Sequence, residues 1–425
     1  MAVLIGKARV SAARRMRGKG FLGGAIGSEE GMWKSGKGIG GEASATWRVA
    51  DRGDGSRSRK PRPRACLVAQ PRFGCAAMID VHDLPALRAL GRRLKVAEAE
   101  LRRVEKALFK HRLPVDEVLA ALPESAREAW RAEVAWRPLT LVTRQDSAVD
   151  GASKLGFRTE DGATIESVLL RFHTGRSSVC LSTQVGCAAD CAFCATGKLG
   201  LKRNLTAAEI IDQVLQAARL FRAEGRTLRN LVFMGMGEPL HNEAAVAEAV
   251  DALRDPERFN FTERHIVVST VGVPAAMVRF AERFPGVNLA LSLHSAREEV
   301  RRRLVPTTRR HSLADMRAAA EAVTARQRNP LMVEYLLFDG LTDTDADLEA
   351  LRAFVAGIPV HINLIPFNAI AEADGLGLRG TPRERREAFG AALKRAGLKV
   401  TLRRSLGADI DGACGQLARR ELADE

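Results

Sequence analysis

Three cysteines in one short stretch of the chain constrain its fold and chemistry more than any other feature. They are Cys187, Cys191 and Cys194, with the spacing C-x3-C-x2-C. Three thiolates can hold three corners of a 4Fe–4S cube, whereas a purely structural cluster usually has four cysteine ligands. One iron then lacks a protein ligand and is open to another molecule. The spacing therefore indicates a catalytic cluster.

A zinc site is the alternative interpretation of these cysteines. Zinc takes four nitrogen or sulfur ligands, usually from paired C-x2-C knuckles. The sequence has no second knuckle, and the nearest cysteine upstream, Cys180, falls in a predicted strand. The spacing therefore favours the cluster.

Length and composition exclude several classes of protein. The chain has 425 residues, 46% of them hydrophobic, which is enough for one large core and an accessory domain. No stretch approaches the ~20 apolar residues that a membrane-spanning helix needs. Seven cysteines, three of them in one loop, do not make a disulfide framework. We therefore expect a cytoplasmic protein in a reducing environment.

The basic charge is concentrated at the N-terminus. The net charge is +15, and residues 1–77 contribute +11 of it, with 16 Lys and Arg against 5 Asp and Glu. This segment is predicted to be a disordered basic tail, because it cannot bury enough apolar surface to fold alone. Three interpretations of this segment are open: a basic arm that contacts RNA phosphates, an extension before a true start at Met78, or an organelle transit peptide. The extension is favoured, and Cys66 and Cys75 receive no role.

Helical periodicity dominates the next segment. From Asp83 to about Trp136 apolar residues recur at helical spacing, which predicts a small helical accessory domain over residues 78–138. Its basic side chains either grip RNA or form a solvated helix face, which is the commoner case. Residues 139–178 are predicted to form an antiparallel β lead-in. Its expected strands are 140–143 and 165–170, and its expected turns contain Gly151, Gly156, Gly162 and Gly175.

Strands and helices alternate through residues 179–405. The predicted strands are 179–183, 230–234, 265–270, 289–293, 332–338, 361–365 and 399–403. Predicted helices begin near Thr206, Glu243, Pro274, Ser312 and Arg383, and a further helix is expected between the fifth and sixth strands. Such β-α units imply an α/β fold with a parallel sheet, and about six units predict a partial (β/α)6 barrel. Chemistry in such barrels lies at the carboxyl ends of the strands, where the cysteine loop is expected.

Polar motifs follow several of these strands. They are Gly237-Glu238 after the second strand, Ser269 in the third, Ser292-Leu293-His294 in the fourth and Asn368 after the sixth. A glycine lets the backbone approach a ligand closely, and the glutamate can accept from an ammonium group. The serine, histidine and asparagine side chains can hydrogen-bond a ribose or an adenine. Each is weak alone, since a serine at a strand end is commonly a cap, but their joint placement on one rim supports a shared binding site.

The run from Gly407 to Leu417, which contains Cys414, is the most specific motif. Together with the three cysteines, Phe193 before the last of them and the strand-end motifs, it makes residues 166–417 resemble radical S-adenosylmethionine (SAM) methyltransferases that modify an adenosine in RNA. Two groups share these motifs. One methylates adenine C2 in 23S ribosomal RNA and often in tRNA. The other comprises the chloramphenicol–florfenicol resistance enzymes, which methylate C8.

The resemblance implies the cofactors and the roles of the site residues. Cys187, Cys191 and Cys194 would hold a 4Fe–4S cluster whose open iron binds SAM. Two SAM molecules would serve each turnover, one to methylate Cys414 and one to generate the radical that activates this methyl group. The implied SAM contacts are Gly237, Glu238, Ser269, Ser292, Leu293, His294 and Asn368.

Two further roles come from the resemblance alone. Cys180 would be the resolving cysteine, which releases the product and forms a transient disulfide with Cys414, and Glu166 would accept the ring proton. From the residues themselves, Cys180 is equally a small buried side chain, and Glu166 is equally a surface carboxylate on an edge strand. The implied partners of a monomeric enzyme are RNA and an electron donor such as flavodoxin or ferredoxin.

The regiochemistry and the function class remain open at this level. Gly237-Glu238-Pro239 follows the C2 group, whereas residues 194–206 and Phe284-Pro285 are closer to the C8 group. A radical SAM activase or maturase that acts on a protein is an alternative, against which the Cys414 segment, residues 406–425, argues. A non-catalytic RNA-binding Fe–S protein is another, for which an open iron would have no use.

Overall fold

The computed structural model describes residues 78–418, without the side chains of 372–374. The expected basic tail, its two cysteines and residues 419–425 lie outside the described part. Within it, none of the helices combines the length and the apolar character that crossing a membrane requires.

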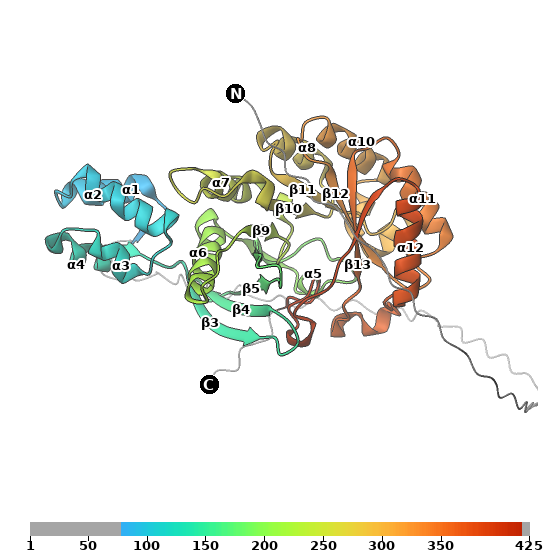
Figure 1. Cartoon of the computed structure of the whole chain (residues 1–425), viewed down its shortest axis with the longest axis horizontal. Helices are drawn as coiled ribbons and strands as arrows, with labels where there is room; N and C mark the ends of the chain where they lie inside the picture. Colours follow the sequence, from blue (N-terminus) through green and yellow to red (C-terminus); the bar gives the residue numbers. More distant parts are fainter. Residues whose placement is uncertain (1–77, 419–425) are drawn as a thin grey trace, which may run out of the picture. The chain divides into compact units, whose positions relative to one another are not determined.

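A ten-stranded mixed sheet organises the described chain (Figure 1). Its order is β14-β13-β12-β11-β10-β9-β6-β5-β4-β3. The parallel part comprises β6 (Ser177–Cys180), β9 (Asn230–Phe233), β10 (Ile266–Thr270), β11 (Asn288–Ser292), β12 (Leu331–Leu337), β13 (Val360–Pro366) and β14 (Lys399–Leu402). These strands follow one another in chain order, so the predicted partial α/β barrel is confirmed.

Helices cover the outer face of this sheet (Figure 1). They are α6 (Ala207–Ala223), α7 (Glu243–Arg254), α8 (Pro274–Arg283), α10 (Leu313–Thr324), α11 (Asp345–Val355) and α12 (Arg383–Arg395). Thr206, Ser312 and Thr344 begin three of them with capping boxes, which satisfy backbone N–H groups that a helix start leaves unpaired. Two short helices near the rim, α5 (Ala195–Lys198) and α9 (Glu298–Leu304), were not predicted.

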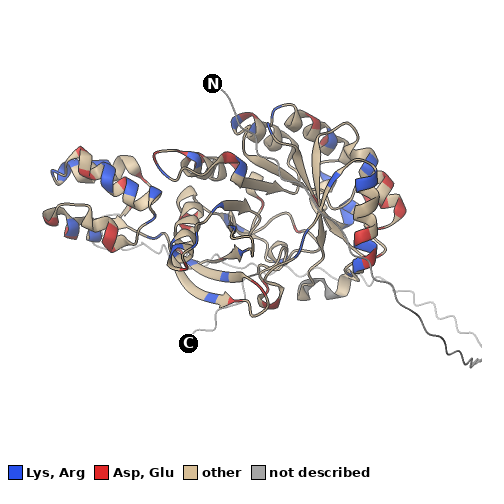
Figure 2. Cartoon of the chain, in the orientation of Figure 1, with Lys and Arg blue, Asp and Glu red and all other residues tan. Residues whose placement is uncertain are grey.

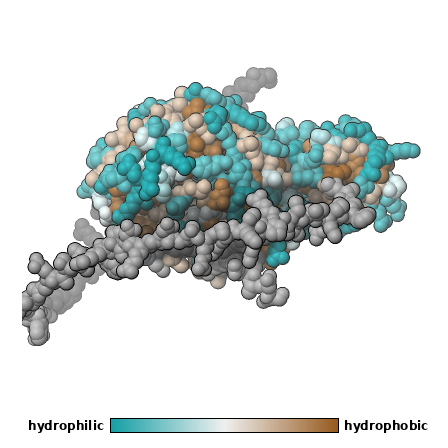
Figure 3. Space-filling model, turned by 180° about the vertical axis from the view of Figure 1, so that it is seen from behind, coloured by the Kyte–Doolittle hydropathy of each residue, from teal (hydrophilic) through white to brown (hydrophobic). Residues whose placement is uncertain are grey.

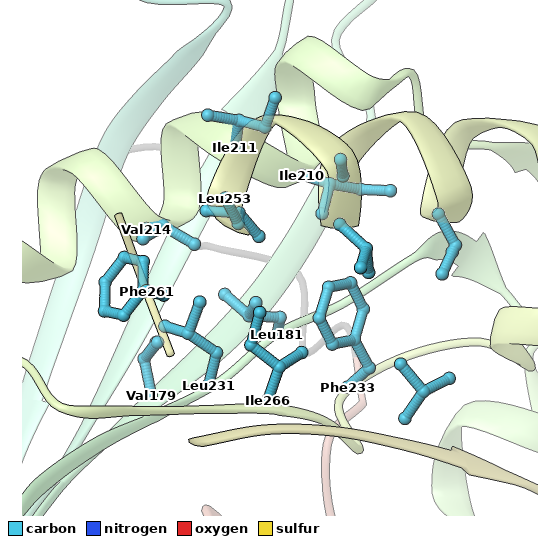
Figure 4. Packing of buried hydrophobic residues seen from close by; sticks show 14 of the residues in the cluster. Val179, Leu181, Ile210, Ile211, Val214, Leu231, Phe233, Leu253, Phe261 and Ile266 are labelled. Carbon is cyan, nitrogen blue, oxygen red and sulfur yellow. The ribbon is translucent and has the colours of Figure 1, made fainter. Parts of the chain in front are cut away.

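The core lies between the strands and the helices. In Figure 4, Ile210 and Val214 of α6 pack above Leu231 of β9 and Ile266 of β10, and all four side chains are fully buried. Burying a side chain of this size contributes roughly 1.5–3 kcal/mol. Because successive residues of a strand point to opposite faces, the neighbour Val232 faces the barrel interior, where it lines a cavity.

The lead-in strands β3 (Leu139–Asp146), β4 (Ala152–Thr159) and β5 (Thr164–Arg171) extend the sheet in antiparallel fashion and join the barrel through β6. The prediction of a turn at Gly156 is wrong, because this residue lies inside β4. A Cβ at this position would come 2.3 Å from Oγ1 of Thr143 on the neighbouring strand, so glycine here permits close strand packing.

The first barrel strand also ends earlier than predicted. β6 stops at Cys180, and Gln184–Gly186 form a separate strand, β7, that pairs with β8 (Leu201–Asn204). Ser182 leaves the ladder, since its N–H donates to Oε1 of Gln213 and its hydroxyl accepts from N–H of Met236. The cysteine loop therefore follows β7 and not the first barrel strand directly.

The segment before the sheet is helical, as the periodicity predicts. It contains β1 (Ile79–Asp80), α1 (Leu84–Arg93), α2 (Glu98–Glu105), a π-helical turn (Lys106–Lys110), α3 (Val115–Ala120), α4 (Glu124–Glu133) and β2 (Val134–Ala135). Basic and acidic residues are interspersed along these helices and along the outer barrel helices (Figure 2). The face seen in Figure 3 is mostly hydrophilic where it is visible.

Candidate active site

The three predicted cluster cysteines line one cleft at the barrel rim. Cys187 and Cys191 are buried, Cys194 is partly exposed, and all three are free. The cleft holds about 960 Å³, counting the open space at its mouth. Cys187 follows β7 and Cys194 immediately precedes α5, so a short sheet and a helix fix the two ends of the loop.

This donor set fits a cluster better than a single ion. Burial raises the pKa of Cys187 to about 12, and burial together with the charges of Cys194 and Cys187 also raises the pKa of Cys191. Among residues 78–418, no three His, Cys, Asp or Glu side chains are arranged to hold a single metal ion. In a cube each thiolate binds a different iron, so the sulfurs stand farther apart than around one ion. Iron binding would compensate these buried thiolates.

Gly237 and Glu238 occupy the cleft wall after β9. Gly237 has φ +100°, and a Cβ there would lie 2.6 Å from the side chain of Gln184. Oε1 of Glu238 accepts from N–H of Leu240 at 2.9 Å, and Oε2 accepts from N–H of Val271 at 2.8 Å. Burial raises the pKa of Glu238 to about 7. The carboxylate thus joins the loops after β9 and β10 at the cleft.

Ser269, Ser292 and His294 line the same cleft. The two serine hydroxyls are 3.1 Å apart. His294 has φ +57°, and its Nδ1 accepts from N–H of Leu336 at 3.2 Å. Burial lowers the pKa of His294 to about 3, so the imidazole is neutral. Its ring meets the edge of Phe193 in the cysteine loop, with the centroids 4.7 Å apart.

Two of the expected SAM contacts do not line this cleft. Leu293 is fully buried and is not among the residues that line the cleft. Asn368 instead contacts the C-terminal segment, because its Nδ2 donates to the carbonyl oxygen of Cys414 at 3.1 Å. Asn368 therefore holds the segment that carries Cys414.

Cys414 connects the cleft to a second cavity inside the barrel. It is exposed, and it lines both spaces together with Met234, Ile365, Arg403 and Leu417. Cys180, at the end of β6, lines only the second cavity. Burial raises the pKa of Cys180 to about 12, and the charge of Cys414 acts in the same direction. The structure therefore brings the two predicted redox partners to one cavity.

Glu166 lies outside both cavities. It is a buried residue of β5, and Nζ of Lys154 is 3.3 Å from its Oε1. Burial raises the pKa of Glu166, whereas Lys154 lowers it. Its N–H points to the sulfur of Met236 in the loop that carries Gly237.

A polar cluster beside the two thiols was missed by sequence reasoning. Arg403, at the end of β14, has NH1 3.6 Å from Oε2 of Glu334 on β12. Asn363 on β13 donates to Oε1 of Glu334 at 2.9 Å. The negative charges of Cys414 and Cys180 both raise the pKa of Arg403. The available signal was the glutamate in the otherwise apolar strand Leu331–Leu337, since a buried charge is retained only where it has a partner.

Backbone and side-chain hydrogen bonds fasten the C-terminal segment beside the cysteine loop. N–H of Ala195 donates to the carbonyl of Gly415 at 2.8 Å, and the hydroxyl of Thr196 donates to the carbonyl of Leu417 at 2.5 Å. Both donors belong to α5, directly after Cys194. The segment that carries Cys414 is therefore held by the element that follows the expected cluster loop.

Comparisons with known proteins agree with this geometry. Residues 181–355 match the Radical SAM superfamily, which is the class of protein that the barrel and its cysteine loop define. A radical SAM methyltransferase from Sphaerobacter thermophilus has a similar structure, with a TM-score of 0.74 and 38% identity over 80% of this chain and 99% of that one.

Proteins with similar sequences identify the family within this superfamily. A Rhodopirellula baltica protein named a probable RNA methyltransferase is 44% identical over 81% of this chain and 88% of its own. A probable dual-specificity RNA methyltransferase RlmN of Thermus thermophilus is 41% identical over 70% of this chain and 82% of its own. The chain belongs to the RlmN-type family of radical SAM RNA methyltransferases.

Proposed function

We propose that the protein methylates a ring carbon of an adenosine, C2 or C8, in 23S ribosomal RNA, with tRNA as a second substrate. The observation that carries this proposal is the position of Cys414, which lines both the cleft of the three cysteines and the cavity of Cys180. A methyl group carried by Cys414 would thus face the cofactor on one side and the resolving thiol on the other. The relatives named dual-specificity RNA methyltransferases support the choice of RNA.

Cys187, Cys191 and Cys194 would hold the 4Fe–4S cluster, and Glu238, Ser269, Ser292 and His294 would contact SAM beside it. When bound, these cofactors supply a methyl group and a 5′-deoxyadenosyl radical, with two SAM molecules used per turnover. Glu238 would accept from the ammonium group of SAM, and this contact would favour the ionised carboxylate despite its burial. The two neighbouring serine hydroxyls offer hydrogen bonds to the nucleoside.

Cys414 would act first as a nucleophile. Its sulfur forms a bond to the methyl carbon, the bond between that carbon and the SAM sulfur breaks, and the thiol proton leaves to solvent. Asn368 and Thr196 would hold the backbone of the segment during this displacement. One hydrogen atom of the methyl group would pass to the 5′-deoxyadenosyl radical, and the methylene carbon that remains would form a bond to the adenine ring. The ring would then lose one proton and one electron, which would return to the oxidised cluster.

Cys180 would release the product. Its thiolate forms a sulfur–sulfur bond with Cys414, the bond from Cys414 to the RNA-linked carbon breaks, and that carbon takes a proton to become methyl. A buried thiol needs a nearby cation to ionise, and Arg403 occupies that position. Glu166 is the proposed acceptor of the ring proton. Cellular thiols would reduce the disulfide.

The second cavity is the proposed entry for the target nucleotide. Apolar Val168, Leu170 and Val232 line its wall, whereas Arg176 and Arg404 stand among its polar lining residues. An unstacked base packs well on an apolar wall, and guanidinium groups bind the flanking phosphates. We further propose a monomeric, cytoplasmic enzyme that receives electrons from flavodoxin or ferredoxin.

The test combines the reconstituted full-length protein with SAM, a reductant and 23S ribosomal RNA or tRNA, followed by nuclease digestion and mass spectrometry. We expect methyladenosine with the retention of the C2 or C8 isomer, and none with Cys414→Ala. The matched control is Cys66→Ala, a cysteine outside the described residues. Deoxyadenosine formation without modified RNA would contradict the proposal, and a radical formed on an added protein would favour the activase alternative.

A further inference from the structure

Arg301 is a fully buried cation that the proposed reaction does not use. It lies on α9 (Glu298–Leu304), and its exposed fraction is 0%. Its Nε donates to the carbonyl of Leu293 at 3.0 Å, and NH1 donates to the hydroxyl of Thr308 at 2.6 Å. NH2 donates to the carbonyl of Val271. NH2 also donates to the carbonyl of Ser292 at 3.5 Å. All four acceptors are neutral, and within residues 78–418 no carboxylate forms an ion pair with this guanidinium.

The two neighbouring arginines on the same helix are exposed to solvent, unlike Arg301. Arg302 is half exposed and pairs with Glu298 at 3.1 Å, and Arg303 is exposed and donates to the carbonyl of Leu376. Glu298 is thereby engaged by another arginine, and its Oε2 also accepts from N–H of Leu313. Arg301 alone on this helix is both buried and without a carboxylate partner among the described residues.

The helix of Arg301 packs against the cysteine loop. N–H of Ala192, between the second and third cysteines, donates to the carbonyl of Leu304 at 2.9 Å. Val300 and Leu304 belong to the same buried cluster as Cys187 and Cys191. Burial lowers the pKa of Arg301 to about 10, and the negative charge of Cys191 opposes this shift more than that of Glu298 does. Arg301 is therefore charged at neutral pH, and the sulfur of Cys191, ionised when it binds iron, would be the anion that acts on it most.

A buried charge without an anionic partner is destabilising. A 4Fe–4S core bound by three thiolates has a net negative charge, and reduction by one electron makes that charge larger. A fixed cation next to such a cluster stabilises the reduced state more than the oxidised state. A cluster beside Arg301 would supply the anionic partner that the buried guanidinium lacks, and the guanidinium would offset part of the negative charge of the cluster.

We propose that Arg301 is a positioning residue that places a permanent positive charge beside the cluster and raises its reduction potential. The inference rests on the assignment of Cys187, Cys191 and Cys194 as cluster ligands. This positive charge makes the cluster easier to reduce before the radical step. The hydrogen bonds to the loops after β10 and β11 give Arg301 a structural role as well, so the test has to separate charge from structure.

The experiment is a potentiometric titration of the reconstituted cluster, followed by electron paramagnetic resonance of its reduced form. We compare the native chain with Arg301→Met, which removes the charge and retains the length, and with Arg301→Lys, which keeps the charge and loses the guanidinium fork. Arg302→Met, on the same helix but half exposed, is the matched control. Iron content and circular dichroism establish that each variant folds and binds the cluster.

For Arg301→Met we expect at least a tenfold lower ratio of reduced to oxidised cluster at a fixed potential. This change corresponds to a midpoint about 59 mV more negative for a one-electron couple. The midpoints of Arg301→Lys and Arg302→Met should stay near the native value. Equal midpoints in Arg301→Met and the native chain would overturn the inference, and equal shifts in the Met and Lys variants would show a structural effect only.

Two outcomes keep the inference apart from the proposed function. Failure of the native chain to bind iron would refute the cluster assignment and, with it, the role of Arg301, whereas a native midpoint in an Arg301→Met protein that binds the cluster would refute the role of Arg301 alone. If Arg301→Met does not fold, Arg301→Gln, which keeps hydrogen-bond donors for the strand-end carbonyls, is titrated in its place with the same expected shift. A native midpoint in the glutamine variant would then decide against the proposal.

Discussion

Cys180 and Cys414 have contrasting surroundings although they line the same cavity. Cys414 is exposed on an irregular segment, whereas Cys180 is buried at the end of a strand. Because thiolates and not thiols are nucleophiles, the exposed cysteine suits the first displacement. The negative charge of Cys414 contributes to the raised pKa of Cys180. Once Cys414 carries a carbon substituent this repulsion disappears, so we expect Cys180 to ionise more readily late in the reaction.

The raised pKa of Cys180 would make the proposed release step dependent on pH. Since this pKa is about 12, the thiolate fraction rises with pH throughout the physiological range. We expect the covalent adduct between enzyme and RNA to decay about tenfold faster per pH unit between pH 7 and 9. Denaturing gels of samples quenched after one turnover measure this decay. In Cys180→Ala the adduct should persist at every pH, and a flat profile in the native chain would exclude Cys180 as the resolving thiolate.

Gly237 is the residue at which a single methyl group should damage the cleft most. Its φ of +100° disfavours any side chain, and a Cβ would meet Gln184, which also binds N–H of Glu238. We expect Gly237→Ala to cost about 1–3 kcal/mol of stability from strain alone and to weaken SAM binding at least tenfold in equilibrium dialysis. Gly397→Ala, with φ +83° and open space around it, is the control. It should lose stability without losing SAM affinity.

At the level of elements, α5 connects the cysteine loop to the C-terminal segment. The buried hydroxyl of Thr196 donates to the carbonyl of Leu417. Thr196→Val keeps the shape and leaves that carbonyl without its donor, at a cost of about 1–3 kcal/mol. We expect several-fold slower methylation with an unchanged iron content. Thr324→Val removes a comparable hydroxyl bond on α10, remote from the cleft, and should leave the rate unchanged. Equal rates in both variants would show that this bond does not position Cys414.

Regular periodicity made most elements predictable, and the exceptions have physical reasons. The parallel strands are buried apolar runs, which sequence shows directly. α9 was missed because Glu298 to Leu304 is mostly charged and gives no amphipathic pattern, although it carries the buried Arg301. Gly156 was misplaced because glycine signals a turn and a close strand contact equally well. The three cysteines and most of the strand-end residues singled out from sequence line one cleft, whereas Leu293 and Asn368 do not. Arg403 required the strand register that places it beside two thiols.

For the whole molecule, the contact between the helical segment and the barrel is the least predictable feature from sequence. Phe109 of the π-helical turn packs on Phe259 of the α7–β10 connection, with ring centroids 5.4 Å apart. Arg112 donates to the carbonyl of Phe259 and covers the ring of Phe261. Arg219 of α6 donates to the carbonyl of Leu113. These contacts join residues remote in sequence, which periodicity cannot reveal. We propose that residues 78–138 are a domain that this interface couples to the barrel.

The coupling can be tested with tryptophan fluorescence. In a chain that begins at Met78, the two remaining tryptophans, Trp130 and Trp136, both lie in the helical segment, so fluorescence reports its unfolding while circular dichroism reports the whole chain. We expect coincident urea transitions in that chain. Phe259→Ala removes a fully buried ring, at a cost of about 3–5 kcal/mol, and should move the fluorescence transition to lower urea than the dichroism transition. The control is Phe389→Ala, a buried ring of α12 that packs on Tyr335 of β12, and it should lower both transitions together. Coincident transitions in Phe259→Ala would show that the helical segment depends on the barrel through other contacts.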